Sequence, residues 1–172
     1  MPVEPLDTLK PSVHPSAFVH PSAWVIADVQ IDRESSIWPM SVLRGDAGRI
    51  TVGARTNLQD GTIAHATTHQ TTTTIGSDCT VGHRVTLHGC TVASHCLIGM
   101  GSTLLDGVVL GEWCFVAAGT LLPPGKTFPP KSFIIGNPGR CVREVEAREV
   151  EMITHGAKGY VELMLWHQRK LG

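Results

Sequence analysis

The sequence predicts an all-β protein, a parallel β-helix, with one α-helix at its C-terminal end. Two observations predict it. Branched aliphatic residues recur every six positions over most of the chain, and residues 141–170 carry a helical pattern instead. Ordinary strands alternate with period two and do not hold a six-residue phase over many consecutive repeats. A chain that turns after every six residues, with three short strands in each coil, accounts for the period.

The repeat places one aliphatic residue inside the coil at each sixth position, with small slips and one excursion near residues 66–74. These positions are Val13, Val19, Val25, Ile31, Ile37, Leu43, Val52, Leu58, Ala64, Ile75, Val81, Leu87, Val92, Ile98, Leu104, Leu110, Val116, Leu122, Phe128 and Ile134. Small residues often follow them, which suits tight corners. About six or seven coils of roughly 18 residues, spaced by about 4.8 Å, give a prism roughly 30 Å long.

The repeat stops at Gly136-Asn137-Pro138-Gly139, a cluster typical of a turn. We therefore expect residues 1–140 to form the β-helix domain and residues 141–172 to form a helix packed on it, with a break near Gly156 or Gly159. The expected apolar stripe of this helix comprises Val142, Val145, Val150, Ile153, Val161, Leu165 and Trp166.

Composition limits the possible partners. The chain has 172 residues, is 42% hydrophobic and 17% charged, and has a net charge of −1. The absence of a basic stripe argues against nucleic acid, and the absence of an apolar run of about 20 residues argues against a membrane. The N-terminal stretch MPVEPLDTLKPSV lacks a secretory pattern, so we expect a cytoplasmic protein. The chain has five cysteines, and no two of them form a CxxC pair, which predicts reduced, mostly buried thiols.

The stretch TVGHRVTLHGC, residues 80–90, holds His83 and His88. His65 and His88 each follow an inward aliphatic, and position 87 lies one coil beyond position 64 if residues 66–74 are an excursion. We expect these two imidazoles to face the same way in adjacent coils. His83 sits two places into the preceding repeat, so it can reach the same ion only from a neighbouring chain. A threefold ring of chains would then supply three imidazoles, which with water make an open zinc site.

Other histidines have simpler interpretations. His95 is expected at a surface corner. His69, in the stretch ATTHQTTTT, is expected to be an exposed loop residue, with a proton relay as the alternative.

Two polar motifs precede the histidines: Arg44-Gly45-Asp46 and Asn57-Leu58-Gln59-Asp60-Gly61. We expect Arg44 and Gln59 near corresponding places in successive coils. Arg44 can form a bidentate pair with a carboxylate of a neighbouring chain, and Gln59 can orient a metal-bound water through its amide. In a monomer these charged groups would simply be solvated.

With the motifs RGD, NLQDGTIAH, VGHRVTLHGC and LIGMGSTLLDG in place, residues from about 10 to 165 resemble the γ-class carbonic anhydrase family. The resemblance implies a left-handed β-helix and a homotrimer with a metal at each subunit interface. It also implies reversible hydration of CO₂ to bicarbonate by a metal-bound hydroxide. The implied metal is Zn²⁺, with Fe²⁺ or Co²⁺ as alternatives.

The resemblance also implies roles for individual residues. His65 and His88 ligate from one subunit, and His83 from the next. Arg44 forms an interface pair, Gln59 orients water, and further site residues are Asp46, Asn57, Asp60 and Tyr160.

The loop ATTHQTTTTIG departs from the best-known members of that family because it contains no carboxylate. Ala47 also stands where some members have a glutamate. The chain therefore resembles a short-loop subclass, and we expect slow turnover limited by proton transfer.

Three alternatives remain at this point. A hexapeptide-repeat acyltransferase shares the prism and trimer, and the segment GNPGR resembles the end of many such enzymes. A metal-dependent thioesterase would keep the three histidines and accept an acyl-CoA. A non-catalytic trimeric metal-binding protein would use the ion for assembly alone.

Overall fold

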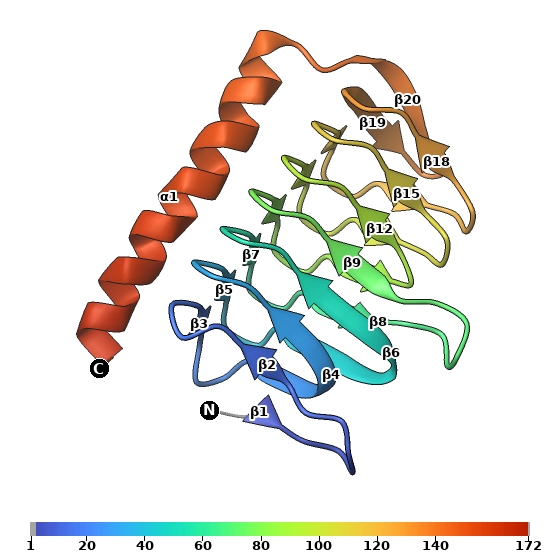
Figure 1. The fold of residues 1–172 in the computed structure, drawn as a ribbon. Coiled ribbons are helices and arrows are strands. Elements are labelled where there is room, and N and C mark those ends of the chain that lie inside the picture. Colours follow the sequence, from blue (N-terminus) through green and yellow to red (C-terminus); the bar gives the residue numbers. More distant parts are fainter. Residues whose placement is uncertain (1–2, 172) are drawn as a thin grey trace.

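The computed structural model describes residues 3–171, which form a stack of coils with one helix along its side (Figure 1). The predicted parallel β-helix with a C-terminal helix is confirmed. One sheet has twelve strands: β1 (Val3–Glu4), β2 (Ser12–Val13), β4 (Trp24–Ile31), β6 (Val42–Val52), β8 (Ile63–His65), β9 (Thr73–Ile75), β11 (Thr86–His88), β12 (Thr91–Val92), β14 (Thr103–Leu104), β15 (Val109–Leu110), β17 (Leu121–Leu122) and β18 (Thr127–Phe128).

The other sheet has eight strands: β3 (Phe18–Val19), β5 (Ser36–Ile37), β7 (Asn57–Leu58), β10 (Thr80–Val81), β13 (Leu97–Ile98), β16 (Phe115–Val116), β19 (Ser132–Gly136) and β20 (Gly139–Glu144). Seven of these strands, β3 to β19, are parallel and come from successive coils, whereas β20 pairs antiparallel with β19. The long strands β4 and β6 each pair on both sides of a corner, so two faces of the prism form one continuous sheet.

The core is the column of repeat residues. Every predicted inward position is buried except Val13, which is partly buried in the first coil. Parallel pairing stacks these side chains directly, as with Val81 on Ile98 and Ile98 on Val116. The six-residue period therefore predicts the interior of the fold. Each coil adds one inward aliphatic residue on each face, and it stacks on the residue of the same face in the previous coil.

A second column, of thiols, lines one corner. Cys79, Cys96 and Cys114 are buried, and each donates a hydrogen bond to a backbone carbonyl of the next coil at 3.2 to 3.3 Å. All five cysteines are free and only Cys141 is exposed, as predicted. Burial raises the pKa of the Cys90 thiol to about 12, so this thiol stays protonated at neutral pH.

The C-terminal segment differs from the prediction at its start. Residues Gly139–Glu144 form β20 rather than helix, because the turn after β19 brings the chain back beside that strand. Helix α1 (Ala147–Leu171) begins only at Ala147 and is continuous, without the expected break. At its N-terminus, the carboxylate of Glu149 accepts the backbone N–H of Glu146 at 2.8 Å, which caps the first turn.

The predicted apolar stripe of the helix is only partly right. Ile153, Ala157 and Met164 face the prism and are buried, whereas Leu165 and Trp166 are exposed and Val142 lies in β20. The prism covers only a narrow strip of the helix, so positions beside that strip remain in solvent. No helix within residues 3–171 is long and apolar enough to span a membrane.

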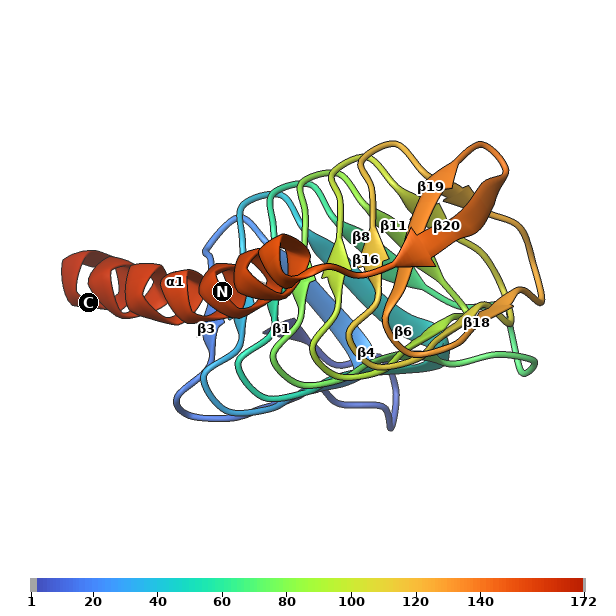
Figure 2. The same ribbon diagram turned by 90° about the horizontal axis from the view of Figure 1, so that it is seen from above.

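Gly156 explains how closely the helix approaches the sheet. A Cβ at this position would lie 2.9 Å from Oγ1 of Thr80, which is too close for an ordinary contact. Further along, Phe18, Trp38 and Met164 form a small core between α1 and the first coils. Figures 1 and 2 show the helix running back along the coils toward the N-terminal end.

Candidate metal centre

His65 and His88 lie side by side on adjacent strands. They are register partners in β8 and β11, as the coil count predicts. Nδ1 of His65 and Nε2 of His88 are 3.3 Å apart, and the ring centroids are 5.3 Å apart. The excursion after His65 therefore leaves the alignment of the two strands intact.

In each of these histidines, the ring nitrogen that points away from the other histidine contacts a carboxylate. Nε2 of His65 lies 3.0 Å from Oδ1 of Asp46, and Nδ1 of His88 lies 3.2 Å from both oxygens of Asp106. An ionised carboxylate only accepts hydrogen bonds, so these ring nitrogens are the donors. In the neutral imidazoles, the nitrogens that face each other then both carry lone pairs.

Two facing lone pairs need a shared proton or cation between them. Two nitrogens bound to one tetrahedral zinc ion, each at its usual bond length, are about 3.3 Å apart. The separation of His65 and His88 fits that arrangement. A carboxylate on the remote nitrogen is also the usual companion of a metal-bound histidine. The pair therefore fits two ligands of a divalent cation.

The two carboxylates stay ionised at neutral pH. Partial desolvation works against this, but hydrogen bonds from Arg44 and His65 lower the pKa of Asp46. Arg44 Nη1 lies 2.5 Å from Oδ2 of Asp46 in the same chain. Desolvation likewise opposes ionisation of Asp106, while hydroxyl donors and the nearby His88 lower its pKa. Both groups are thus negative partners for a cationic centre.

A second group of predicted residues lies at the other end of the same strands. Nδ1 of His83 is 3.0 Å from Oδ2 of Asp60, just before β8 and β11 begin. The buried Gln59 donates through Nε2 to Oδ1 of Asn57 at 3.1 Å, and Asn57 donates to Oγ1 of Thr80. His83 therefore also has one ring nitrogen on a carboxylate and the other available.

Tyr160, on α1, lies near this second group. Its ring packs edge-on against Trp38, with centroids 5.5 Å apart. Burial, with a contribution from the negative charge of Asp60, raises the pKa of Tyr160. The phenol therefore stays protonated at neutral pH and can act as a hydrogen-bond donor.

The nine predicted site residues thus fall into two groups on one chain. The first comprises Arg44, Asp46, His65 and His88, and the second comprises Asn57, Gln59, Asp60, His83 and Tyr160. Within residues 3–171, no cluster of three or more His, Cys, Asp or Glu side chains is placed to hold a metal. A three-histidine centre would require ligands from two chains.

The expected correspondence of Arg44 and Gln59 is wrong. Leu43 pairs with Ala64, so the position in the next coil that corresponds to Arg44 is His65 and not Gln59. The backbone N–H of Gln59 instead donates to Val81. The long strand β6 adds residues to its coil as it passes the corner, which shifts the count between the two motifs.

Asp106 was missed by the sequence reasoning. It lies 18 residues after His88, which is one coil of three six-residue repeats. That spacing was the available signal. Its carboxylate also accepts the hydroxyls of Thr67 and Thr71 at 2.9 and 2.8 Å.

The segment of residues 66–72 projects from the prism on the side away from α1 (Figure 1). It contains no carboxylate. The backbone N–H of His69 donates to the carbonyl of Ala47 at 3.1 Å, and the His69 side chain is exposed at the tip. His69 thus faces solvent from a segment attached to the same face as His65.

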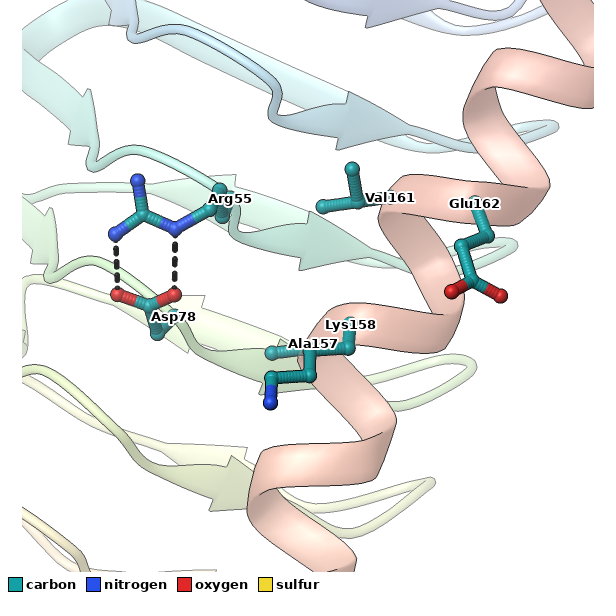
Figure 3. A pocket seen from close by; sticks show the side chains of 6 residues that line it. All are labelled: Arg55, Asp78, Ala157, Lys158, Val161 and Glu162. Carbon is teal, nitrogen blue, oxygen red and sulfur yellow. Dashed lines mark hydrogen bonds and ion pairs between the residues drawn. The ribbon is translucent and has the colours of Figure 1, made fainter.

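A separate hollow of about 270 Å³ lies between α1 and a corner of the prism (Figure 3). Its lining residues are Arg55, Asp78, Ala157, Lys158, Val161 and Glu162. Arg55 and Asp78 form a bidentate pair with both contacts at 2.7 Å. None of the predicted site residues lines this hollow, so the candidate chemistry lies elsewhere.

The stacked six-residue coils define a hexapeptide-repeat protein, and two imidazoles, each beside a carboxylate, lie next to each other on one of its faces. The family described as "Hexapeptide repeat of succinyl-transferase" matches residues 72–105 and 91–123. Gamma carbonic anhydrase 2, mitochondrial, from Arabidopsis thaliana is 43% identical over 162 residues, covering 91% of this chain and 58% of that protein. The chain thus spans less than two thirds of this relative. Carnitine operon protein CaiE from Escherichia coli K12 is 40% identical over 156 residues, covering 91% and 79%.

Two solved structures share the fold of this chain over nearly its whole length. A Bacillus cereus protein described as a candidate acetyltransferase superposes with a TM-score of 0.94 at 36% identity, covering 96% of each chain. A hexapeptide transferase family protein from Anaplasma phagocytophilum has a TM-score of 0.90 at 37% identity, covering 94% of this chain and 95% of the other. The chain belongs to the γ-class carbonic anhydrase family of hexapeptide-repeat proteins.

Proposed function

We propose that the protein is a carbonic anhydrase that interconverts CO₂ and bicarbonate at sites between the subunits of a homotrimer. One observation carries the proposal: three histidines each have a carboxylate on one ring nitrogen, and they lie in two groups at opposite ends of β8 and β11. Such a division suits a centre completed by a neighbouring chain.

His65 and His88 of one subunit, with His83 of the next, are the proposed ligands of a divalent cation. Zn²⁺ suits three imidazoles best, and Fe²⁺ and Co²⁺ are alternatives. When bound, the cation supplies acidity, lowering the pKa of a water from about 16 towards 7. The three carboxylate partners hold the rings in one orientation and favour the tautomer with a free lone pair.

Gln59 is the proposed orienting group for the attacking water. Its Nε2 is held by Asn57, which directs the amide and leaves Oε1 as the acceptor for a water hydrogen. Tyr160 is proposed to support this group from α1 as a neutral donor, because burial raises its pKa.

Exposed apolar side chains support assembly at these surfaces. Ile63 and Trp24, on the face that carries His65, are 47% and 43% exposed. Met40 and Met100, at the corner that carries His83, are 69% and 56% exposed. Apolar patches of this kind on a globular surface are typical of protein interfaces. Arg44 and Asp46 lie on the same face and are proposed to contact the neighbouring subunit.

Proton release is proposed to limit the rate. Residues 66–72 offer no carboxylate, and His69 is the one titratable side chain in that segment. Protons would leave through buffer or through His69, so turnover is expected to be slow when buffer is dilute.

The test mixes two inactive chains. The variant His83→Ala keeps His65 and His88, whereas the double variant His65→Ala/His88→Ala keeps His83. If the two chains assort at random in co-expressed trimers, roughly one quarter of the interfaces have all three histidines, His65 and His88 from one chain and His83 from the next. We expect the co-expressed protein alone to regain zinc and CO₂ hydration, at about that fraction of the wild-type level. No recovery in trimers of mixed composition would overturn the proposal.

An acyltransferase is the second candidate, because two similar solved structures carry transferase descriptions. Titration of the protein with acetyl-CoA, with assays for acyl transfer and for thioester hydrolysis, separates the candidates. Zinc recovery in the mixed trimers without CO₂ hydration, together with acyl-CoA turnover, would favour this alternative or the thioesterase. Zinc recovery with neither activity would favour a non-catalytic metal protein.

A further inference from the structure

The segment of residues 66–72 is held to the prism by one carboxylate. Oγ1 of Thr67 donates to Oδ2 of Asp106 at 2.9 Å, and Oγ1 of Thr71 donates to Oδ1 at 2.8 Å. The hydroxyl of Thr71 also accepts the backbone N–H of Thr67 at 2.9 Å. Asp106 therefore closes the segment on itself as well as attaching it to the coil below.

The same carboxylate contacts the imidazole of His88. Both oxygens of Asp106 lie 3.2 Å from Nδ1 of His88. One side chain thus joins the segment to a ring whose other nitrogen faces His65. Displacement of Asp106 would release both neighbours.

Gly89 leaves the space that this carboxylate occupies. A Cβ at Gly89 would overlap both Oδ1 of Asp106 and Oγ1 of Thr71. The residue also has φ of +62°, which glycine adopts without strain. The glycine directly after His88 therefore permits the contact between carboxylate, hydroxyl and imidazole.

The segment has a second attachment, on β6. Besides the bond from His69 to Ala47, the carbonyl of Thr71 lies where a Cβ of Gly48 would stand. Contacts on both sides fix the segment beside His65 and His88. This arrangement is that of an ordered wall of the site and not of a mobile lid.

We propose that Asp106 is a positioning residue that couples the order of residues 66–72 to the orientation of His88. The proposal rests on the proposed function for its metal-binding part. By accepting the Nδ1 proton, Asp106 holds His88 in the tautomer whose Nε2 lone pair faces His65. Because coupling is reciprocal, an ordered segment favours cation binding, and a bound cation favours the ordered segment.

The decisive variant is Asp106→Asn, which keeps the shape of the side chain but replaces an acceptor with a donor. Thr71→Val removes one of the two hydroxyl attachments to Asp106 and the acceptor of the Thr67 N–H, and it leaves the contact between Asp106 and His88 in place. Thr91→Val, on an exposed position of β12, is the matched control for a lost threonine hydroxyl. Glu162→Gln, on α1, is the control for a lost carboxylate.

Two measurements use the metal-free full-length protein. Amide hydrogen exchange of residues 67–71 should accelerate in Asp106→Asn and in Thr71→Val, and should not change in the two controls. Long-range ¹H–¹⁵N spectra of the imidazoles should show His88 protonated at Nδ1 in the wild type and as a tautomer mixture in Asp106→Asn. Unchanged exchange and an unchanged tautomer in a folded Asp106→Asn protein would overturn the proposal.

The third measurement is Zn²⁺ affinity, by competition with a chromophoric chelator. We expect Asp106→Asn to bind Zn²⁺ roughly 10- to 100-fold more weakly, Thr71→Val to show a smaller loss, and the controls to match the wild type. If the wild type fails to bind Zn²⁺ while exchange and tautomer respond as expected, the proposed function fails and the positioning role of Asp106 stands. Wild-type affinity in Asp106→Asn would contradict the coupling to the metal.

Discussion

Nδ1 of His65 and Nε2 of His88 lie 3.3 Å apart although 23 residues separate them in the chain. Parallel pairing of β8 and β11 brings them together, and carboxylates on the remote nitrogens turn both lone pairs inward. The arrangement places the two proposed ligands of one cation on a single face. The proposed third ligand, His83, lies in the other group, so the proposal makes the neighbouring subunit a testable requirement.

The first prediction concerns His83. Replacement by alanine is expected to reduce bound zinc to a small fraction of the wild-type amount, because a pair of imidazoles binds zinc far more weakly than three. Elemental analysis and analytical ultracentrifugation check the result. A trimer of unchanged mass is expected. Dissociation into monomers would instead identify the metal as structural.

The second prediction concerns the proposed interface. Ile63→Glu places a charge on an exposed position of β8 and leaves the buried column untouched. We expect monomers with an unchanged circular dichroism spectrum, because a desolvated, unpaired carboxylate disfavours association. Val109→Glu is the control, since Val109 is exposed on a different face. Equal effects of the two substitutions on sedimentation would argue against an interface at Ile63.

The third prediction concerns pH. Hydrogen bonds from the side chain of Arg143, and to a smaller extent from the backbone N–H of Glu146 and the side chain of Arg148, lower the pKa of Glu149 from 4.5 to about 2. Because the folded pKa is lowered, the stabilisation is present above about pH 4.5 and disappears as the pH falls towards 2. Glu149→Gln should therefore lower the denaturation midpoint at pH 7 and make little difference near pH 2. A pH-independent difference in urea unfolding would contradict this assignment.

The fourth prediction compares two glycines of α1. Gly159→Ala meets no atom within 4 Å and should stabilise the protein by about 0.5–1 kcal/mol through helix propensity. Gly156→Ala should destabilise it by about 1–3 kcal/mol, because the new methyl group would contact Thr80. Thermal unfolding of both variants checks the pair. Similar gains in both would show that the helix does not pack closely on β10.

The fifth prediction concerns turnover. If proton release is limiting, the rate of CO₂ hydration should rise with buffer concentration. His69→Ala should reduce the rate at low buffer concentration only. Stopped-flow measurements at several imidazole concentrations check both statements. Fast turnover that is independent of buffer would contradict a proton-transfer limit.

Much of the fold is present in the six-residue period. Ile98, Leu104 and Leu110 are buried where the count places them, because stacked coils leave no freedom in which residue faces inward. The start of the helix was less accessible. Val142 and Val145 fit a helical stripe locally, but pairing with β19 holds residues 139–144 as a strand. Tertiary pairing here overrides a local pattern.

The positions of site residues were predictable where the six-residue repeat runs without interruption or with one known excursion, and not where extra residues shift it. The pairing of His65 with His88 needed only the assumption of one excursion. The position of Arg44 depended on the extra residues that β6 adds at a corner, and no residue type announces such an addition. Asp106 was missed, although it lies 18 residues, or one coil, after His88.

Helix α1 has a consequence for how the molecule unfolds. Coils that contact only their neighbours can separate from either end independently. In this chain Glu149 binds Arg143 beside the last coil, while Gln168 reaches the carbonyl of Ala17 and His167 packs near Phe18 in the first. The first coil cannot open without releasing a helix that is anchored at the opposite end. The two ends of the stack are therefore expected to lose structure in one cooperative transition.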